Sequence, residues 1–172
     1  MTAQRRDFFR IVVGTGLLVA GYSIANDQWV AAIAPQHFFM FHPAYFPWAQ
    51  AWEQALSFSL LAGAFGVAWG ILLYGAGRVG PGPVLTPRAT LRGVLVVIAG
   101  TAALAWGLGW RAAATGHFPY PRYLCPSDSL AIFVTQTVQL TNDLAGLVGA
   151  LLWLVLIILY RWSTPETPPD LD

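Results

Sequence analysis

The chain has 172 residues, of which 56% are apolar and only 10% are charged, and its mean hydropathy is +0.57. Because a soluble domain carries about 25% charged residues, this composition excludes an ordinary soluble domain and indicates a membrane protein. Nine basic residues, all of them arginine, face eight carboxylates. The resulting net charge of +1 gives no broad basic field, so a nucleic acid is not expected as a partner.

Residues 4–10 read Gln4-Arg5-Arg6-Asp7-Phe8-Phe9-Arg10, which is similar to a twin-arginine export signal. Such a signal would be followed by a cleavage site and a soluble domain, yet three further apolar segments follow the first one. We therefore predict an uncleaved first helix whose arginines stay in the cytoplasm.

Four apolar segments lie along the chain, and each approaches or exceeds the roughly 20 residues that cross a bilayer as a helix. They cover about residues 8–25, 51–74, 93–110 and 130–160. This pattern predicts an all-α fold, a bundle of four transmembrane helices that forms one membrane domain over residues 1–162. The fourth segment is longer than a perpendicular span requires, so its helix should tilt or project. The polar, proline-rich tail 163–172 is predicted to be a disordered cytoplasmic segment.

The arginines are distributed unevenly about these four spans. Two of them, Arg111 and Arg122, fall on one side, and the other side carries Arg5, Arg6, Arg10, Arg78, Arg88, Arg92 and Arg161. Because cytoplasmic loops are enriched in arginine, this distribution places both termini in the cytoplasm and the loops 26–50 and 111–129 outside. The expected location is the bacterial inner membrane, with the lipid bilayer itself as the main partner.

Small residues recur at helical spacing in the second span, at Gly63, Gly66 and Gly70. Close backbone approach at such positions is a main source of helix association in lipid. The pattern indicates either a tight bundle within the chain or self-association with other membrane subunits.

Both outer loops are short of charge and rich in aromatic residues and proline. Aromatic rings favour the membrane interface, so these loops are expected to cover the outer end of the bundle. A small hydrophobic ligand could bind beneath such a cover. The residues that would line its site are Trp29, His37, Trp52, Gln136, Gln139 and Asn142.

The polar start of the fourth span supplies Gln136, Gln139 and Asp143, which share one helix face, with Asn142 beside it. Asp27 and Glu53 are expected at the same level, near the outer boundary. Ionisable groups near the membrane are candidates for function because they are costly unless paired. The three carboxylates are therefore candidate catalytic residues, and the alternative is that they pair with arginines or amides to hold the bundle together.

A metal site is the second candidate. Imidazole and thioether ligands suit copper, and the outer loops hold His37, Met40, His42 and His117, with Cys125 as a further thiol. The spacing of these residues has no secondary structure to enforce a geometry, and interfacial histidines often bind only backbone or lipid headgroups. No cofactor is therefore predicted, and copper is the alternative. A single cysteine also excludes an internal disulfide.

The segments 25–28, 33–38 and 41–43 resemble the first outer segment of an uncharacterised family of small bacterial four-span inner-membrane proteins. That family reads His-Asp-Gln, then Ser-Pro-Glu-Tyr-Phe. Here the Asp-Gln pair, the proline and Phe38 match, but Asn26 replaces the histidine, and Gln36 and His37 replace the glutamate and tyrosine. The resemblance implies an inner-membrane protein of this topology, and the absence of the histidine and the glutamate weakens the case for an acid/base role of the segment.

Two classes of function follow. The first is a non-catalytic protein, either an accessory subunit of a membrane complex or a binder of a small hydrophobic ligand at the outer interface. The second is a membrane-embedded enzyme or copper protein that uses the outer histidines and carboxylates. A channel or transporter is disfavoured, because no carboxylate falls clearly at the midplane and no span is visibly broken there.

Overall fold

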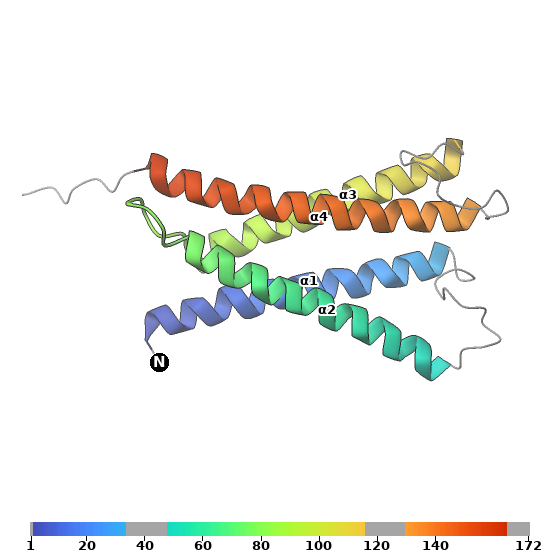
Figure 1. The fold of residues 1–172 in the computed structure, drawn as a ribbon, viewed down its shortest axis with the longest axis horizontal. Helices are drawn as coiled ribbons and strands as arrows, with labels where there is room; N and C mark the ends of the chain where they lie inside the picture. The colour runs from blue at the N-terminus through green and yellow to red at the C-terminus, as the bar shows by residue number, and fades with distance from the viewer. Residues whose placement is uncertain (1, 34–47, 116–129, 165–172) are drawn as a thin grey trace, which may run out of the picture.

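The computed structural model describes the backbone of residues 2–33, 48–115 and 130–164, and it places the side chains of residues 2–26, 59–115, 134 and 137–164. The described residues form four α-helices, so the all-α prediction is confirmed. These are α1 (Ala3–Ile33), α2 (Trp48–Ala76), α3 (Pro87–Thr115) and α4 (Leu130–Ser163) (Figure 1). Each contains a stretch that is long and apolar enough to cross a membrane.

The helices are longer than the predicted spans. Residues 26–33, which we expected to open the first outer loop, belong to α1, and α3 extends beyond both ends of its apolar run. The physical reason is that apolar composition marks only the part of a helix that lies in lipid, whereas backbone hydrogen bonding continues past it. The predicted tail begins inside α4, and its residues 165–172 lie outside the described residues.

The four helices form two antiparallel hairpins, α1 with α2 and α3 with α4, which pack side by side (Figure 1). At one end α1 and α3 begin and α2 and α4 end. We call it the arginine end, because its described residues include Arg5, Arg6, Arg10, Arg78, Arg88, Arg92 and Arg161. At the opposite end α1 and α3 finish and α2 and α4 begin.

Glycines bring α1 and α2 into backbone contact. A Cβ added at Gly66 would lie 2.9 Å from both the Gly16 Cα and the Thr15 carbonyl oxygen, and one at Gly70 would lie 2.8 Å from the Val12 Cα. No side chain fits at these two positions. The small-residue pattern in α2 therefore packs against α1 within the chain, and self-association through the same glycines would have to displace α1.

The hairpin of α3 and α4 also depends on a glycine. The indole ring of Trp153 lies over Gly93, where an added Cβ would come within 2.0 Å of it. Around this contact all four helices contribute buried side chains to one apolar core: Ile11, Trp69, Leu73, Ala76, Val94, Ala150 and Ile157. The core lies in the half of the bundle nearer the arginine end, and this is where the two hairpins are joined by apolar packing.

The turn between α2 and α3 is held against the end of α4 by Arg161, which is only 4% exposed. Its Nε donates to the Val79 carbonyl oxygen at 3.3 Å, and its Nη2 donates to the Gly80 carbonyl oxygen at 2.5 Å. In return, the Gly82 N–H donates to the Arg161 carbonyl oxygen at 2.9 Å. Gly80 has a φ of +98°, a conformation that glycine adopts without strain, so the turn can present its carbonyls to the guanidinium.

Candidate functional site

A polar contact joins the two hairpins in the half of the bundle nearer the opposite end. Asn142 of α4 accepts a hydrogen bond from the Tyr22 hydroxyl of α1. The Asn142 Nδ2 donates in turn to the Asn26 Oδ1, at 2.8 Å. Tyr22 and Asn26 are four residues apart, so they lie on one face of α1 and both reach the same amide.

This contact, which we call the Tyr22–Asn142–Asn26 link, pairs polar groups that lipid could not satisfy. An unpaired amide or hydroxyl in an apolar environment is costly, and hydrogen bonds across membrane helices relieve that cost. The link holds α4 at a fixed rotation against α1, because Asn142 can make both bonds only when its side chain faces α1. Its chemistry is that of a structural contact, since it contains two amides and a phenol and no ionised group.

A double-mutant cycle on Tyr22→Phe and Asn142→Leu should show a coupling of about 0.5 to 1.7 kcal/mol, the range for hydrogen bonds between membrane helices. The coupling arises because each substitution removes the same hydrogen bond. Unfolding in a mixed detergent titration measures it. Tyr160→Phe is the control, since Tyr160 is exposed, and additive effects of the first two substitutions would contradict the link.

Gln139 and Asp143 face away from the bundle. Both side chains are exposed, and they lie four residues apart on α4 inside the apolar stretch Thr137–Ser163. Among the residues whose side chains are described, none forms a hydrogen bond or ion pair with Asp143. At about 1.5 Å per residue, Asp143 lies about 20 Å along α4 from Leu130. It lies six residues, or about 9 Å, inside the apolar stretch Thr137–Ser163, so its expected position near the outer boundary stays a prediction.

The polar residues at the start of α4 thus divide into two groups. Asn142 turns inward to α1, whereas Gln139 and Asp143 turn outward. The backbones of Asp27 and Glu53 lie in helical turns toward the opposite end, on α1 and α2. Their side chains are not described, so the convergence of Asp27, Glu53 and Asp143 on one site stays a prediction.

The remaining predicted site residues fall where the structure gives no side-chain placement. Trp29, Trp52 and Gln136 lie within α1, α2 and α4 as backbone positions. The copper candidates and the single cysteine lie outside the described residues: His37, Met40, His42, His117 and Cys125. Copper binding therefore stays a prediction.

The contacts of two residues were not predicted from the sequence: the bond of Tyr22 to Asn142 and the bonds of Arg161 to the turn between α2 and α3. Tyr22 was not singled out, although its spacing of four residues from Asn26 is a signal that both share a helix face. Arg161 was used only to orient the chain, although an arginine directly after a long apolar run is well placed to bind carbonyls at a helix end.

Comparison of the chain with protein-family models, with curated proteins and with solved structures finds no significant match. The resemblance of the first outer segment to the four-span inner-membrane family therefore stays a prediction. The fold itself defines the class: four long apolar helices make this an all-helical, multi-pass membrane protein.

Proposed function

We propose that the chain is a non-catalytic accessory subunit of a membrane complex, and that it contacts its partner through the outward face of α4. The observation that carries the proposal is the exposed Asp143, together with Gln139, inside a stretch of helix apolar enough to lie in lipid. Beside them on the outward side of α4 lie exposed leucines that would pack against a neighbouring helix: Leu140, Leu144, Leu147 and Leu151.

A carboxylate that faces lipid is poorly solvated. Such a group costs about 2.5 to 3.5 kcal/mol at the centre of a span and less toward its ends, and carboxylates inside spans are almost always paired. Asp143 has no partner among the described side chains of its own chain. A second membrane helix that presents an arginine, lysine or amide at this depth would satisfy it, and Gln139, one turn away, would add a second hydrogen bond.

The location that we propose is the bacterial inner membrane, with both termini in the cytoplasm. The supporting observation is the asymmetry of the described arginines, because the arginine end carries seven of them and the opposite end carries Arg111. In this orientation the Tyr22–Asn142–Asn26 link lies in the outer half of the membrane. A ligand beneath the outer loops, an outer-face enzyme site and copper binding depend on residues 34–47 and 116–129, and they stay alternatives.

Extraction of the tagged protein from its native membrane directly into polymer nanodiscs tests the proposal. We expect a particle heavier than one copy of the chain in lipid, and we expect Asp143→Leu with Gln139→Leu to reduce the bound partner at least about tenfold, the effect of losing about 1.4 kcal/mol. Leu60→Ala on the exposed face of α2 is the control and should retain the partner. A solitary wild-type chain would refute an accessory role.

A further inference from the structure

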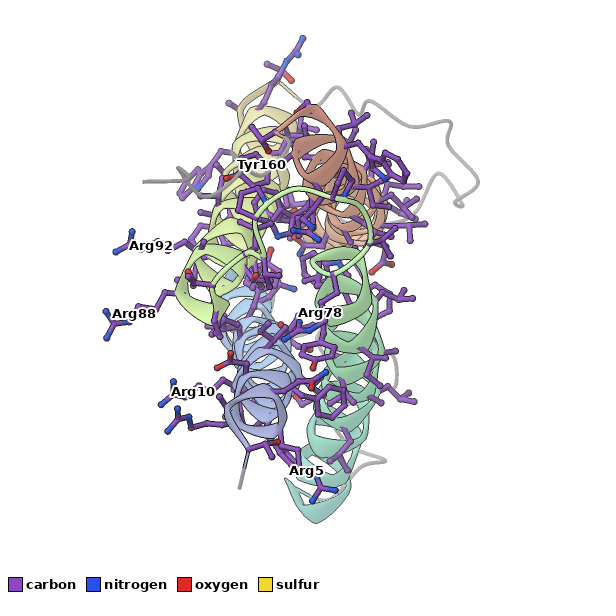
Figure 2. All side chains as sticks on the ribbon, turned by 90° about the vertical axis from the view of Figure 1, so that its left-hand side faces the viewer. Arg5, Arg10, Arg78, Arg88, Arg92 and Tyr160 are labelled. Atoms are coloured by element: carbon purple, nitrogen blue, oxygen red, sulfur yellow. The ribbon has the colours of Figure 1, made fainter. Side chains whose placement is uncertain are left out.

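Three exposed arginines from two helices point to the same side of the arginine end. Arg10 of α1 and Arg88 and Arg92 of α3 all project to one side in Figure 2, which views the bundle from this end. The contact between the helices fixes their level, since a Cβ added at Gly14 would lie 3.0 Å from the Leu91 Cδ2. Both helices begin at this end, and Arg10 and Arg88 each lie about one turn before that contact. We call these three residues the three-arginine surface.

The charge of this surface is not neutralised within the described part of the chain. No ion pair joins Arg10, Arg88 or Arg92 to another described residue, although Asp7 lies one turn from Arg10. The first turn of α3 contains no acidic residue, and its capping group is the neutral Thr86 hydroxyl, which accepts from the Ala89 N–H at 3.3 Å.

The start of α3 strengthens the preference for an anion. The helix dipole places partial positive charge at its N-terminus, and Arg88 and Arg92 add two full charges within the first two turns. Like charges gathered in this way are stabilised by a bound anion. Arginine forks match the oxygens of a phosphate group, so phosphate is the anion whose geometry fits best.

The neighbouring side chains favour a phosphate that carries acyl chains. Exposed apolar residues follow the arginines along both helices: Val13 and Leu17 lie one and two turns beyond Arg10, and Val96 lies one turn beyond Arg92. Val96 is 71% exposed. These positions lie in the apolar stretches of both helices, so a lipid could place its headgroup on the arginines and its chains along the valines and leucine.

We propose that the three-arginine surface binds the headgroup of an anionic phospholipid, with acyl chains along Val13, Leu17 and Val96. This inference does not rest on the accessory role proposed above. It names a lipid partner on the side of the bundle formed by α1 and α3, whereas the proposed protein partner contacts α4.

Native mass spectrometry of the protein from nanodiscs with equal amounts of phosphatidylglycerol and phosphatidylcholine tests the site. We expect the wild type to retain phosphatidylglycerol in preference to phosphatidylcholine, and each of the substitutions Arg10→Gln, Arg88→Gln and Arg92→Gln to lower the preference about fivefold. Arg111→Gln, an exposed arginine at the other end of α3, is the matched control and should leave the preference unchanged.

Lysine variants keep the test decisive if a glutamine variant folds poorly. Arg88→Lys with Arg92→Lys retains the charge and should keep a preference for phosphatidylglycerol, weaker than in the wild type because the bidentate fork is lost. Equal retention of the two lipids by the wild type would overturn the proposal. So would a loss in Arg111→Gln as large as that in Arg88→Gln, or displacement of the lipid by inorganic phosphate but not by chloride at equal ionic strength.

Discussion

Replacing Gly66 with leucine is expected to lower the free energy of unfolding by about 3 kcal/mol or more, the upper part of the range for overpacking in a close-packed interior. The reason is that a Cβ at this position would meet backbone atoms of Gly16 and Thr15 at 2.9 Å, and backbone cannot turn aside as a flexible side chain can. The α1–α2 hairpin must then open along its length. Unfolding in a detergent titration, followed by circular dichroism, measures the change.

Gly75→Leu is the matched control, because it makes the same chemical change on the same helix where nothing lies within 4 Å of an added Cβ. This variant should unfold at or above the wild-type denaturant concentration, since leucine is the better helix former by up to about 1 kcal/mol. Equal destabilisation by Gly66→Leu and Gly75→Leu would mean that α1 and α2 are not packed as described.

Replacing Arg161 with methionine is expected to cost about 3 kcal/mol of stability, because hydrogen bonds to a charged group are worth about 1.5 to 3 kcal/mol and several are lost together. The carbonyls of Arg78, Val79 and Gly80 would lose their donor, and the backbone bond from Gly82 alone would then hold the turn between α2 and α3 to α4. Denaturation gives the loss of stability. Leu85 of the turn is partly buried against the apolar core, so the rate at which a thiol reagent labels Leu85→Cys, in a Cys125→Ser background, reports the loosening of the turn.

The control for this prediction is Arg88→Met, which removes an exposed arginine near the same turn and should change stability by no more than about 0.5 kcal/mol. Arg161→Lys should fall between methionine and the wild type, since an ammonium keeps the charge but loses the planar fork that reaches separate carbonyls. Unchanged labelling of Leu85→Cys after Arg161→Met would contradict the role of Arg161 as the anchor of the turn.

Much of the fold could be predicted from the sequence, because a membrane helix needs a long apolar run and the chain has four. The runs gave the number and order of the helices. They did not give the helix ends. Helix α1 continues through polar residues such as Asn26, because backbone hydrogen bonding rather than hydropathy determines where a helix ends. Likewise, the small-residue spacing of α2 indicated close packing but could not identify α1 as the helix that it packs against.

The candidate site was less predictable, because helical spacing shows which residues share a face but not which way that face turns. The spacing of Gln139 and Asp143 predicts one shared face of α4, yet only the packing of α4 against α3 and α2 and the burial of its side chains show that both residues are exposed. The bond between Tyr22 and Asn142 joins residues 120 positions apart, a contact that no local pattern reports.

The most direct test of the central claim, that the outward face of α4 contacts a partner helix, is photo-crosslinking in the native membrane. A benzophenone amino acid in place of Leu147, an exposed residue one turn from Asp143 on α4, should form one discrete adduct with another membrane protein, and Asp143→Leu in the same chain should abolish it. The same probe in place of Leu60, which is 72% exposed on α2, should give only lipid adducts. Lipid adducts alone at position 147, or a protein adduct whose yield Asp143→Leu leaves unchanged, would contradict the account.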